Sequence, residues 1–271
     1  MCKECGCGQV DAFQVNPVNG TVQARPGWSL AGAGAFAHPP AAAPADAPGP
    51  TAGNAVRTID VRAALLDQND RLAERNRGFF LGRRIVALNL VSSPGSGKTT
   101  LLERTLDAFG RAGPRCAVLV GDLETDNDAR RLHRPGVSVA QITTGTACHL
   151  DSTMIARGLE AIDLEGVRLL FIENVGNLVC PADFDLGEQV RVTLLSCTEG
   201  EDKPLKYPPI FKTAHVVLLT KIDAAVPLGF DRAAALENIR RIAPQARVFE
   251  LSARTGEGMA AWFEYLRGLA A

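Results

Sequence analysis

The chain has 271 residues, 46% of them hydrophobic and 22% charged, a balance typical of a globular protein and not of a disordered one. Its 29 Lys and Arg against 30 Asp and Glu give a formal net charge of -1, so composition provides no reason to expect nucleic-acid binding. No run approaches the roughly 20 apolar residues of a membrane span, and the first residues lack a signal-peptide core. We therefore expect a cytoplasmic protein that binds neither nucleic acid nor membrane.

The N-terminal fifth of the chain differs in composition from the rest. Residues 1–8 contain three cysteines, and residues 9–55 are rich in Ala, Pro and Gly, which predicts a flexible linker that isolates the terminal segment. A helix is expected over residues 56–80, because Leu65 and Leu72 recur at helical spacing, and Gly78 is expected to end it.

Residues 81–271 alternate between short apolar runs and helical patterns. Strands are predicted at 85–91, 116–120, 137–142, 168–172, 192–196, 216–219 and 248–251, and helices at 98–110, 149–163, 231–242 and 257–269. Apolar residues at consecutive positions are typical of strands buried on both faces of a parallel sheet. The pattern predicts a doubly wound, mostly parallel α/β fold with ligands at the carboxyl ends of the strands.

The segment SSPGSGKTT, starting at Ser92, follows the first predicted strand of this region. It fits the phosphate-loop pattern G-x-x-x-x-G-K-[ST] except that Ser92 replaces the first glycine. Lys98 would contact the β- and γ-phosphates, and the Thr99 hydroxyl would hold Mg²⁺. An ordinary Gly/Ser turn is the alternative, but a buried strand before the loop and an amphipathic helix after it favour a nucleotide site. We predict nucleotide contacts from Gly95, Ser96, Gly97, Lys98, Thr99 and Thr100.

Two later segments bear on which base is bound. The sequence TKID from Thr220 resembles the guanine motif N-K-x-D, with Thr in place of Asn. The Asp223 carboxylate can accept both the ring N–H and the exocyclic amine of guanine, and Lys221 would lie along the base. Ser252 and Ala253 resemble the start of the S-A-K element, whose backbone N–H meets the guanine oxygen. The order of these elements predicts guanine.

Acidic residues at two strand ends are candidates for Mg²⁺ binding and water positioning. Asp122 follows one predicted strand and Glu173 another, and Gly176, three residues on, would offer its N–H to the γ-phosphate. We expect Lys98, Asp122 and Glu173 to be the catalytic groups. Solvated turn carboxylates are the alternative, which is stronger for the acids farther along the first loop, Glu124, Asp126 and Asp128.

Three thiolates at Cys2, Cys5 and Cys7 can surround one metal ion. With a nitrogen as fourth ligand such a set suits square-planar Ni(II), whereas Zn(II) favours a tetrahedral set, and the spacing leaves both open. A reactive cysteine tail without function is the third alternative.

A second group consists of Cys148 and His149, before a predicted helix, and Cys180, beyond Gly176. Both segments lie in loops after strands, so their side chains can converge beside the nucleotide. Each alone would more often be a buried, inert residue.

Together these segments resemble the HypB family, the GTPases of nickel incorporation into hydrogenase. The matching segments are CKECGC at the N-terminus, SSPGSGKTT, GDLETD from Gly121, CHL from Cys148, ENVGNLVCP from Glu173 and TEGEDKPLKYP from Thr198. The resemblance covers the first eight residues and residues 82–271.

The resemblance implies a SIMIBI-class GTPase that forms a homodimer with GTP and assists nickel insertion into [NiFe]-hydrogenase. It implies a high-affinity nickel site at Cys2, Cys5 and Cys7, and a second Ni or Zn site at Cys148, His149 and Cys180. The implied partners are a HypA-type nickel chaperone and the hydrogenase large subunit. Hydrolysis should be slow and Mg²⁺-dependent, because neither an arginine finger nor a Ras-like glutamine is evident after Gly176.

Two other functions are compatible with the sequence. A urease-type nickel GTPase is the nearest rival, but that family lacks the terminal cysteine motif. A metal buffer with a vestigial nucleotide site would account for Ser92 and Thr220, although Lys98, Thr99 and Asp223 are intact.

Overall fold

A single mixed sheet runs through the computed structural model, which describes residues 13–18, 53–110, 112–124 and 127–271, with the backbone alone for 53–62. The strands are β1 (Gln14–Pro17), β2 (Val86–Ser92), β3 (Cys116–Asp122), β4 (Ser138–Thr143), β5 (Leu169–Glu173), β6 (Val190–Ser196), β7 (Val216–Thr220) and β8 (Arg247–Leu251). Their order is β1-β4-β3-β5-β2-β6-β7-β8. All pairs are parallel except β1 with β4, which confirms the predicted mostly parallel sheet.

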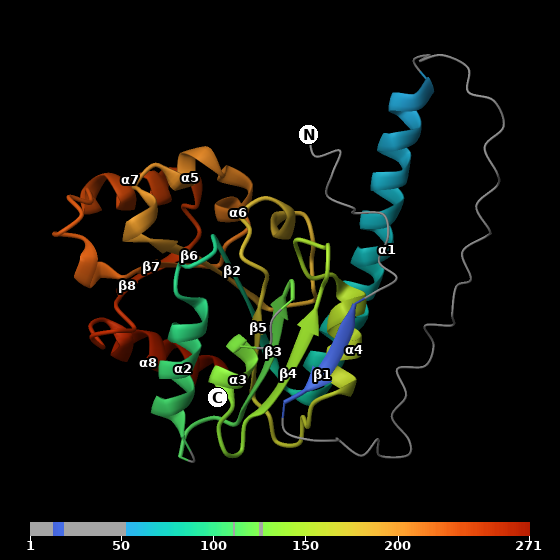
Figure 1. Ribbon diagram of the computed structural model, residues 1–271, viewed down its shortest axis with the longest axis horizontal. Coiled ribbons are helices and arrows are strands. Elements are labelled where there is room, and N and C mark those ends of the chain that lie inside the picture. Colours follow the sequence, from blue (N-terminus) through green and yellow to red (C-terminus); the bar gives the residue numbers. More distant parts are fainter. Residues whose placement is uncertain (1–12, 19–52, 111, 125–126) are drawn as a thin grey trace.

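Helices cover both faces of the sheet (Figure 1). They are α1 (Gly53–Arg83), α2 (Lys98–Phe109), α3 (Asn127–Leu132), α4 (Ser152–Glu160), α5 (Lys203–Lys206), α6 (Pro208–Lys212), α7 (Arg232–Ile242) and α8 (Met259–Ala270). The short helices α3, α5 and α6 were not predicted, because four to six residues are too few to establish a helical period.

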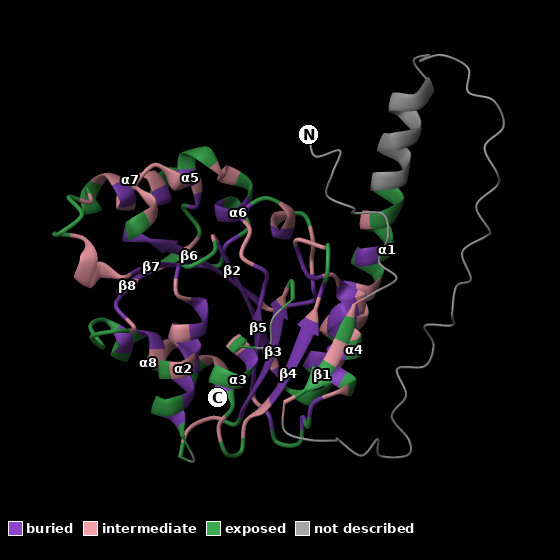
Figure 2. Cartoon of the chain, in the orientation of Figure 1, coloured by how far each residue is buried: buried purple, intermediate pink, exposed green. Residues whose placement is uncertain are grey.

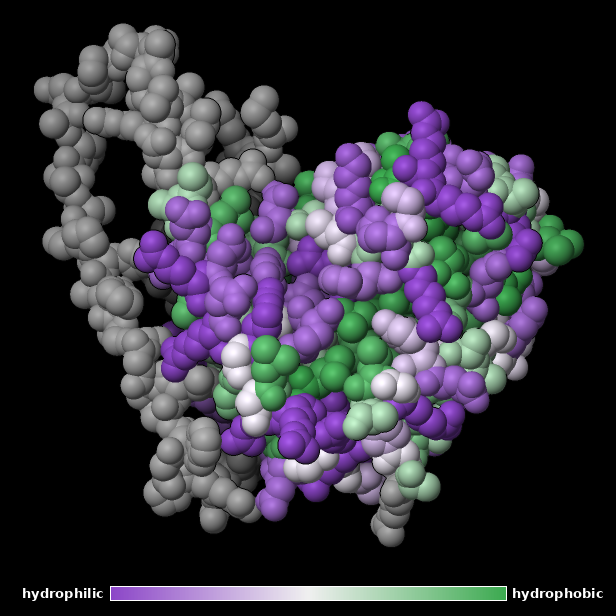
Figure 3. Space-filling model, turned by 180° about the vertical axis from the view of Figure 1, so that it is seen from behind, coloured by the Kyte–Doolittle hydropathy of each residue, from purple (hydrophilic) through white to green (hydrophobic). Residues whose placement is uncertain are grey.

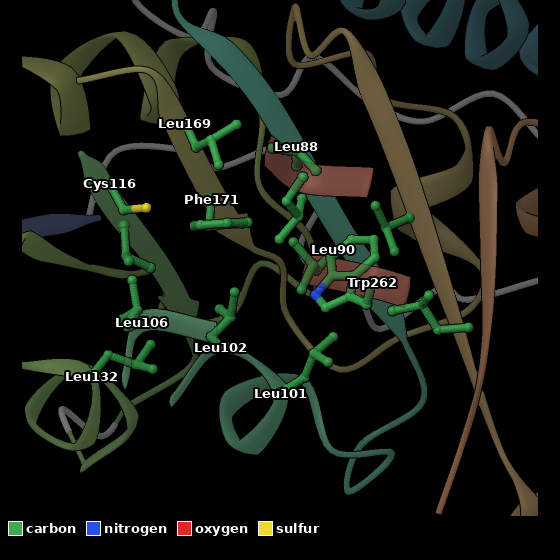
Figure 4. Close-up of a cluster of buried hydrophobic side chains, with 14 of the residues drawn as sticks. Leu88, Leu90, Leu101, Leu102, Leu106, Cys116, Leu132, Leu169, Phe171 and Trp262 are labelled. Atoms are coloured by element: carbon green, nitrogen blue, oxygen red, sulfur yellow. The ribbon is translucent and has the colours of Figure 1, made fainter. Parts of the chain in front are cut away.

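One face of the sheet carries an uninterrupted apolar layer. Leu101 and Leu102 of α2 pack with Trp262 of α8 over Leu88 and Leu90 of the central strand β2 (Figure 4). These side chains are fully buried, and most residues of the strands that lie between β1 and β8 in the sheet are buried as well (Figure 2). This layer fixes α2, and with it the phosphate loop that precedes α2.

The apolar layer on the other face is divided. One cluster includes Phe80 of α1 and Ile155 of α4, and a second includes Phe211 of α6. On β2, Ala87 belongs to the first cluster and Val91 to the second, while Asn89 between them is fully buried and polar. A polar group therefore sits where the two halves of this face meet.

The helix α1 continues past Gly78 to Arg83, so the predicted end at Gly78 is wrong. A glycine inside a helix lowers stability by only about 1 kcal/mol, and buried Phe80 holds the next turn against the sheet. The helix ends where Arg84 takes a left-handed conformation with φ of 54°. The N–H groups of Arg84 and Ile85 then bond to the carbonyls of Leu81 and Phe80, a Schellman arrangement.

The strand β1 lies inside residues 9–55, which the composition predicted to be linker throughout. It forms one edge of the sheet and pairs antiparallel with β4, from Gln14 opposite Thr143 to Pro17 opposite Ala140. The sequence does not alternate clearly here, and a proline is compatible only with an edge position, so the strand pattern was weak. The terminal segment therefore precedes a strand of the sheet directly; residues 1–12 themselves lie outside the described part of the chain.

Among the described residues no helix has the length and apolarity needed to cross a membrane. On the face shown in Figure 3, hydrophilic side chains lie between and around apolar ones over the globular part of the molecule.

Candidate nucleotide and metal sites

The loop between β2 and α2 has the backbone geometry that a phosphate loop needs. Gly95 and Gly97 have φ of 72° and 103°, a left-handed region that side chains disfavour. The Lys98 ammonium donates to Ser92 Oγ at 2.8 Å, and Ser96 Oγ also donates to Ser92. The serine that replaces the expected first glycine thus holds the lysine across the loop.

The next two residues connect the loop to β5. Thr99 Oγ1 donates to Glu173 Oε1 at 2.7 Å, and the other carboxylate oxygen of Glu173 is buried without a hydrogen-bond partner. Burial raises the pKa of Glu173 to about 7, opposed by the positive charge of Lys98. Burial lowers the pKa of Lys98, opposed chiefly by Glu173. A hydroxyl and an unsatisfied carboxylate oxygen at a strand end form a donor set that suits a hard divalent cation.

Gly176 approaches the phosphate loop closely. A Cβ at this position would lie 2.9 Å from the Cα of Pro94. Because the obstacle is backbone, a larger residue would push apart the phosphate loop and the segment after β5. These two segments are therefore in contact at the position where a γ-phosphate would be sensed.

Among the acidic residues at the end of β3 and after it, the structure does not favour Asp122 over Asp128 as the sequence did. Asp122 accepts from the N–H of Leu123 at 2.7 Å. Asp128, for which the sequence favours a solvated turn carboxylate more strongly, opposes the lowering of the Lys98 pKa more than Asp122 does. It lies in the first turn of α3, a helix that the sequence did not reveal. From that helix, Arg131 reaches Asp128 at 3.2 Å and Thr100 Oγ1 at 3.3 Å.

The predicted guanine loop is attached to the phosphate loop. Thr220 Oγ1 donates to the carbonyl of Ser96 at 2.8 Å, and Lys221 Nζ donates to the carbonyl of Gly95 at 2.6 Å. Lys221 is held in a left-handed conformation with φ of 58°. The threonine at the usual asparagine position therefore ties the two loops together.

Asp223, the predicted acceptor for the guanine N–H groups, is held by two side chains of a later segment. Asp223 Oδ1 accepts from Ser252 Oγ at 2.6 Å, and Asp223 Oδ2 lies 3.1 Å from Arg254 Nε. Ser252 is fully buried, whereas the Arg254 side chain is 84% exposed and can move away without loss of packing. The carbonyl of Ala253 accepts from Arg104 of α2 at 2.9 Å. The two segments predicted to recognise the base thus lie side by side.

The second cysteine group does converge. Cys148 Sγ lies 2.9 Å from Cys180 Sγ and 4.0 Å from His149 Nδ1, and the three ligand atoms lie within 4.8 Å of one another. The His149 ring stacks on Phe184 with centroids 3.9 Å apart. Burial lowers the pKa of His149 to about 4, so its imidazole is neutral at pH 7 and can bind a metal. Two thiols and one imidazole suit Ni(II) or Zn(II).

Asparagines hold the metal-site loops against the segment after β5. Asn174 Oδ1 accepts from the N–H of Leu150 at 3.2 Å, and Asn177 Nδ2 donates to the carbonyl of Cys148 at 3.3 Å. Asn174 lies two residues before Gly176, and Asn177 follows Gly176 directly. The segment that touches the phosphate loop therefore also touches the loop of Cys148.

A buried polar network extends from this segment to the loop after Cys180. Asn174 donates to Asn89, Asn89 to Glu188, and Glu188 pairs with Arg191 at 2.7 Å. The Arg191 guanidinium then donates to the carbonyls of Ala182 and Phe184. Sequence analysis missed this network, since nothing in the spacing of its members indicates that they meet.

The remaining cysteines fall into two groups. Cys116 and Cys197 are buried, and burial raises their pKa values to about 12 and about 11, so both remain thiols. Cys2, Cys5 and Cys7 lie outside the described residues, and their role stays a prediction.

Comparison with known proteins identifies the family. A family model described as CobW/HypB/UreG, nucleotide-binding domain, matches residues 86–250. The hydrogenase maturation factor HypB of Escherichia coli (strain K12) is 43% identical over 288 aligned residues, which cover 98% of each chain. The chain belongs to the HypB family of hydrogenase maturation factors. HypB of Azotobacter vinelandii is 51% identical over 211 residues, covering 78% of this chain and 69% of that protein.

Solved HypB structures share the fold. HypB from Archaeoglobus fulgidus aligns with a TM-score of 0.71 and 39% identity, over 76% of this chain and 100% of that one. HypB from Helicobacter pylori in complex with nickel gives a TM-score of 0.70 and 39% identity, over 75% and 95%. The family and the fold that the sequence motifs predicted are thereby confirmed.

Proposed function

We propose that this protein is a GTP-hydrolysing nickel metallochaperone that assists nickel insertion into [NiFe]-hydrogenase. The observation that carries the proposal is a shared segment: residues 173–180 contact the phosphate loop through Glu173 and Gly176 and contribute Cys180 to the metal-site geometry. Membership of a family of hydrogenase maturation factors supports the client, and the nickel complex of the Helicobacter pylori relative supports the cargo.

In the proposed reaction Lys98 and the loop N–H groups hold the β- and γ-phosphates, while Asp223 and Ser252 select guanine. Thr99 and Glu173 would hold Mg²⁺, which when bound offsets phosphate charge. Burial lowers the pKa of Lys98, and the negative charge of Glu173, followed by Asp128, Glu199 and Asp122, opposes that shift. Because neither an arginine finger nor a Ras-like glutamine is evident in the sequence after Gly176, we expect turnover to be slow without a partner or a second copy.

Nickel is the cargo. Cys148, His149 and Cys180 would bind Ni²⁺ or Zn²⁺ as the second site, and Cys2, Cys5 and Cys7 as the tighter one. A GTP-favoured homodimer, a HypA-type chaperone and the hydrogenase large subunit are the proposed partners. The urease-type alternative is disfavoured, since this chain carries the terminal cysteines Cys2, Cys5 and Cys7 and is 43% identical to a hydrogenase maturation factor over 98% of its length.

GTP turnover and nickel titration of variants test the proposal. Lys98→Ala should abolish turnover, whereas Lys212→Ala, an exposed lysine on α6, should leave it unchanged. Replacing Cys148 and Cys180 together with Ser should weaken nickel binding at the second site by more than about 100-fold, because loss of outer-shell groups alone weakens metal sites 10- to 100-fold. Equal turnover of Lys98→Ala and the parent would favour the metal-buffer alternative.

A further inference from the structure

The imidazole of His149 lies face to face with the aromatic ring of Phe184. The two ring centroids are 3.9 Å apart and the ring planes meet at 29°. On the side of the thiols, His149 Nδ1 lies 4.0 Å from Cys148 Sγ. An edge-to-face pair of rings needs centroids about 5 Å apart or more. The imidazole therefore cannot turn edge-on, which would carry Nδ1 away from the thiols, unless Phe184 moves.

Phe184 belongs to an irregular segment, residues 182–186, whose backbone is held from the side of β6. The Arg191 guanidinium donates to the carbonyl of Ala182 at 3.2 Å and to that of Phe184 at 2.9 Å. Arg191 is itself buried and paired with buried Glu188 at 2.7 Å. A charged donor that is shielded from water thus fixes the backbone on which the Phe184 ring stands.

The helices α1 and α4 hold the same segment from the other side. Asn69 of α1 and Ser152 of α4 both donate to the carbonyl of Asp185, at 2.8 and 2.7 Å. Asn76 of α1 donates to the carbonyl of Leu186 at 3.2 Å. These donors are buried as well, so hydrogen bonds from buried side chains leave residues 182–186 little freedom to move.

The Phe184 ring is not part of the hydrophobic core. It belongs to none of the three apolar clusters found among the described residues, and Phe184 is only partly buried. Leu186, two residues on, supplies the core contact of this segment instead. An aromatic ring outside the core, on a backbone that is held so firmly, is placed to support the side chain that it touches, which is His149.

We propose that Phe184 is a positioning residue that holds the His149 imidazole in the orientation in which it binds a metal ion together with Cys148 and Cys180. The inference rests on the proposed function, in which these three residues form the second Ni²⁺ or Zn²⁺ site. The imidazole is then ordered before the ion arrives. Preorganisation of this kind strengthens binding because the ion does not have to immobilise its ligand.

The metal-free protein provides the first test. NMR signals of the His149 imidazole C–H groups should be shifted upfield in the full-length parent by the ring current of Phe184, and the chain has only four histidines, so comparison with His149→Ala identifies them. Phe184→Leu should abolish the shift, and Phe184→Tyr, which keeps the flat ring, should retain it. Phe263→Leu, at a partly buried position of α8 beside the opposite apolar layer, is the control and should change nothing. An unshifted His149 signal in the parent would overturn the proposal.

A double-mutant cycle provides the second test, in the protein with Cys2, Cys5 and Cys7 replaced by Ala. Ni²⁺ and Zn²⁺ are titrated separately. For each ion whose affinity falls in His149→Ala, Phe184→Leu alone should weaken binding about 10-fold, the lower end of the loss usual for groups that orient metal ligands. Added to His149→Ala, Phe184→Leu should change affinity by less than about 2-fold, because a residue that acts through another has no effect once that residue is gone. Equal losses with and without His149 would mean that Phe184 acts on the fold at large and would overturn the proposal.

The same titrations separate failure of the proposal from failure of the proposed function. If Cys148→Ser together with Cys180→Ser leaves the affinities for both ions unchanged, the second metal site is wrong and the positioning role falls with it. If that double replacement weakens binding but His149→Ala weakens neither ion, the metal site stands and the role of Phe184 is overturned.

Discussion

The predicted guanine loop and the Cys148 loop, which lie on either side of the phosphate loop, are joined to it in different ways. At the end proposed to bind guanine, called the guanine end, Thr220 and Lys221 donate directly to backbone carbonyls of the phosphate loop. At the metal end, the Cys148 loop is bonded to Asn174 and Asn177, which lie in the segment after β5, and that segment meets the phosphate loop at Gly176. The guanine end is thus preformed, whereas the metal end is attached through a segment that itself contacts the nucleotide site.

The largest expected effect lies at the guanine end. Asp223→Asn would replace an acceptor oxygen with a donor facing the guanine N–H groups, and the loss of a charge-assisted bidentate contact corresponds to about 2–3 kcal/mol, or roughly 30- to 150-fold in GTP affinity. Competition binding with GTP, ATP and xanthosine triphosphate measures it. Nickel affinity should not change, and equal binding of ATP and GTP by the parent would refute the guanine assignment.

Coupling between the two ends should depend on Gly176. In a background with Cys2, Cys5 and Cys7 replaced by Ala, nickel affinity should differ between GDP and a non-hydrolysable GTP analogue by about 5- to 150-fold. That background should itself retain GTP hydrolysis and lose the tighter nickel site. Gly176→Ala should reduce the difference to below about 2-fold, because its Cβ would force the segment away from Pro94.

Isothermal titration with nickel, in the presence of GDP and of the GTP analogue, gives the ratio of nickel affinities for the background protein and for the Gly176→Ala variant. Gly78→Ala, at an exposed position of α1 with no atom within 4 Å of the new Cβ, is the matched control and should keep the difference. If the parent shows identical affinities in the two states, the metal end is not coupled to the nucleotide at all.

A smaller effect is expected where the two loops are tied. Thr220→Val keeps the shape of the side chain but removes the donor to the carbonyl of Ser96, which should weaken GTP and GDP equally by about 1 kcal/mol, or roughly 5-fold. Fluorescent-nucleotide binding measures this, with Thr153→Val on α4 as a control. If the affinity for GTP falls more than the affinity for GDP, Thr220 takes part in the coupling between nucleotide and metal, and its hydrogen bond to Ser96 is not equally formed in both nucleotide states.

The smallest effect concerns the core thiols. Cys116 and Cys197 should label negligibly with iodoacetamide at pH 8, because burial holds their pKa values at about 12 and about 11 and leaves almost no thiolate. Cys148 and Cys180, which are partly exposed, should label and be protected by nickel. Peptide mass spectrometry distinguishes the four. Nickel-dependent protection of Cys116 would mean that the metal site is misassigned.

Sequence patterns predicted the parallel strands and the order of the site segments because each is a local signal. The phosphate loop needs only nine consecutive residues, and buried strands such as 116–120 are apolar at every position. The cysteine–histidine group was also within reach, since loops after parallel strands meet at one edge.

Other parts of the site depend on contacts between distant residues. Thr220 could replace asparagine only because Ser96 presents a carbonyl to it, 124 residues away in sequence. The network through Asn89, Glu188 and Arg191 joins strands whose polar residues look, one at a time, like interruptions of apolar runs. β1 has too few residues for its pairing with β4 to appear in the pattern.

The divided apolar layer has a consequence for how the molecule opens. The buried polar residues Asn89, Glu188 and Arg191 lie between the apolar cluster of α1 and α4 and the apolar cluster of α6 and α7. The two halves of this face of the sheet are therefore not joined by apolar packing at position 89 of β2. Cooperativity between halves must then pass through the opposite layer and the sheet hydrogen bonds. Because that opposite layer is continuous from β4 to β8, we expect the two halves to unfold together, with the first loss of amide protection in the helices on the divided face, such as α6 and α7.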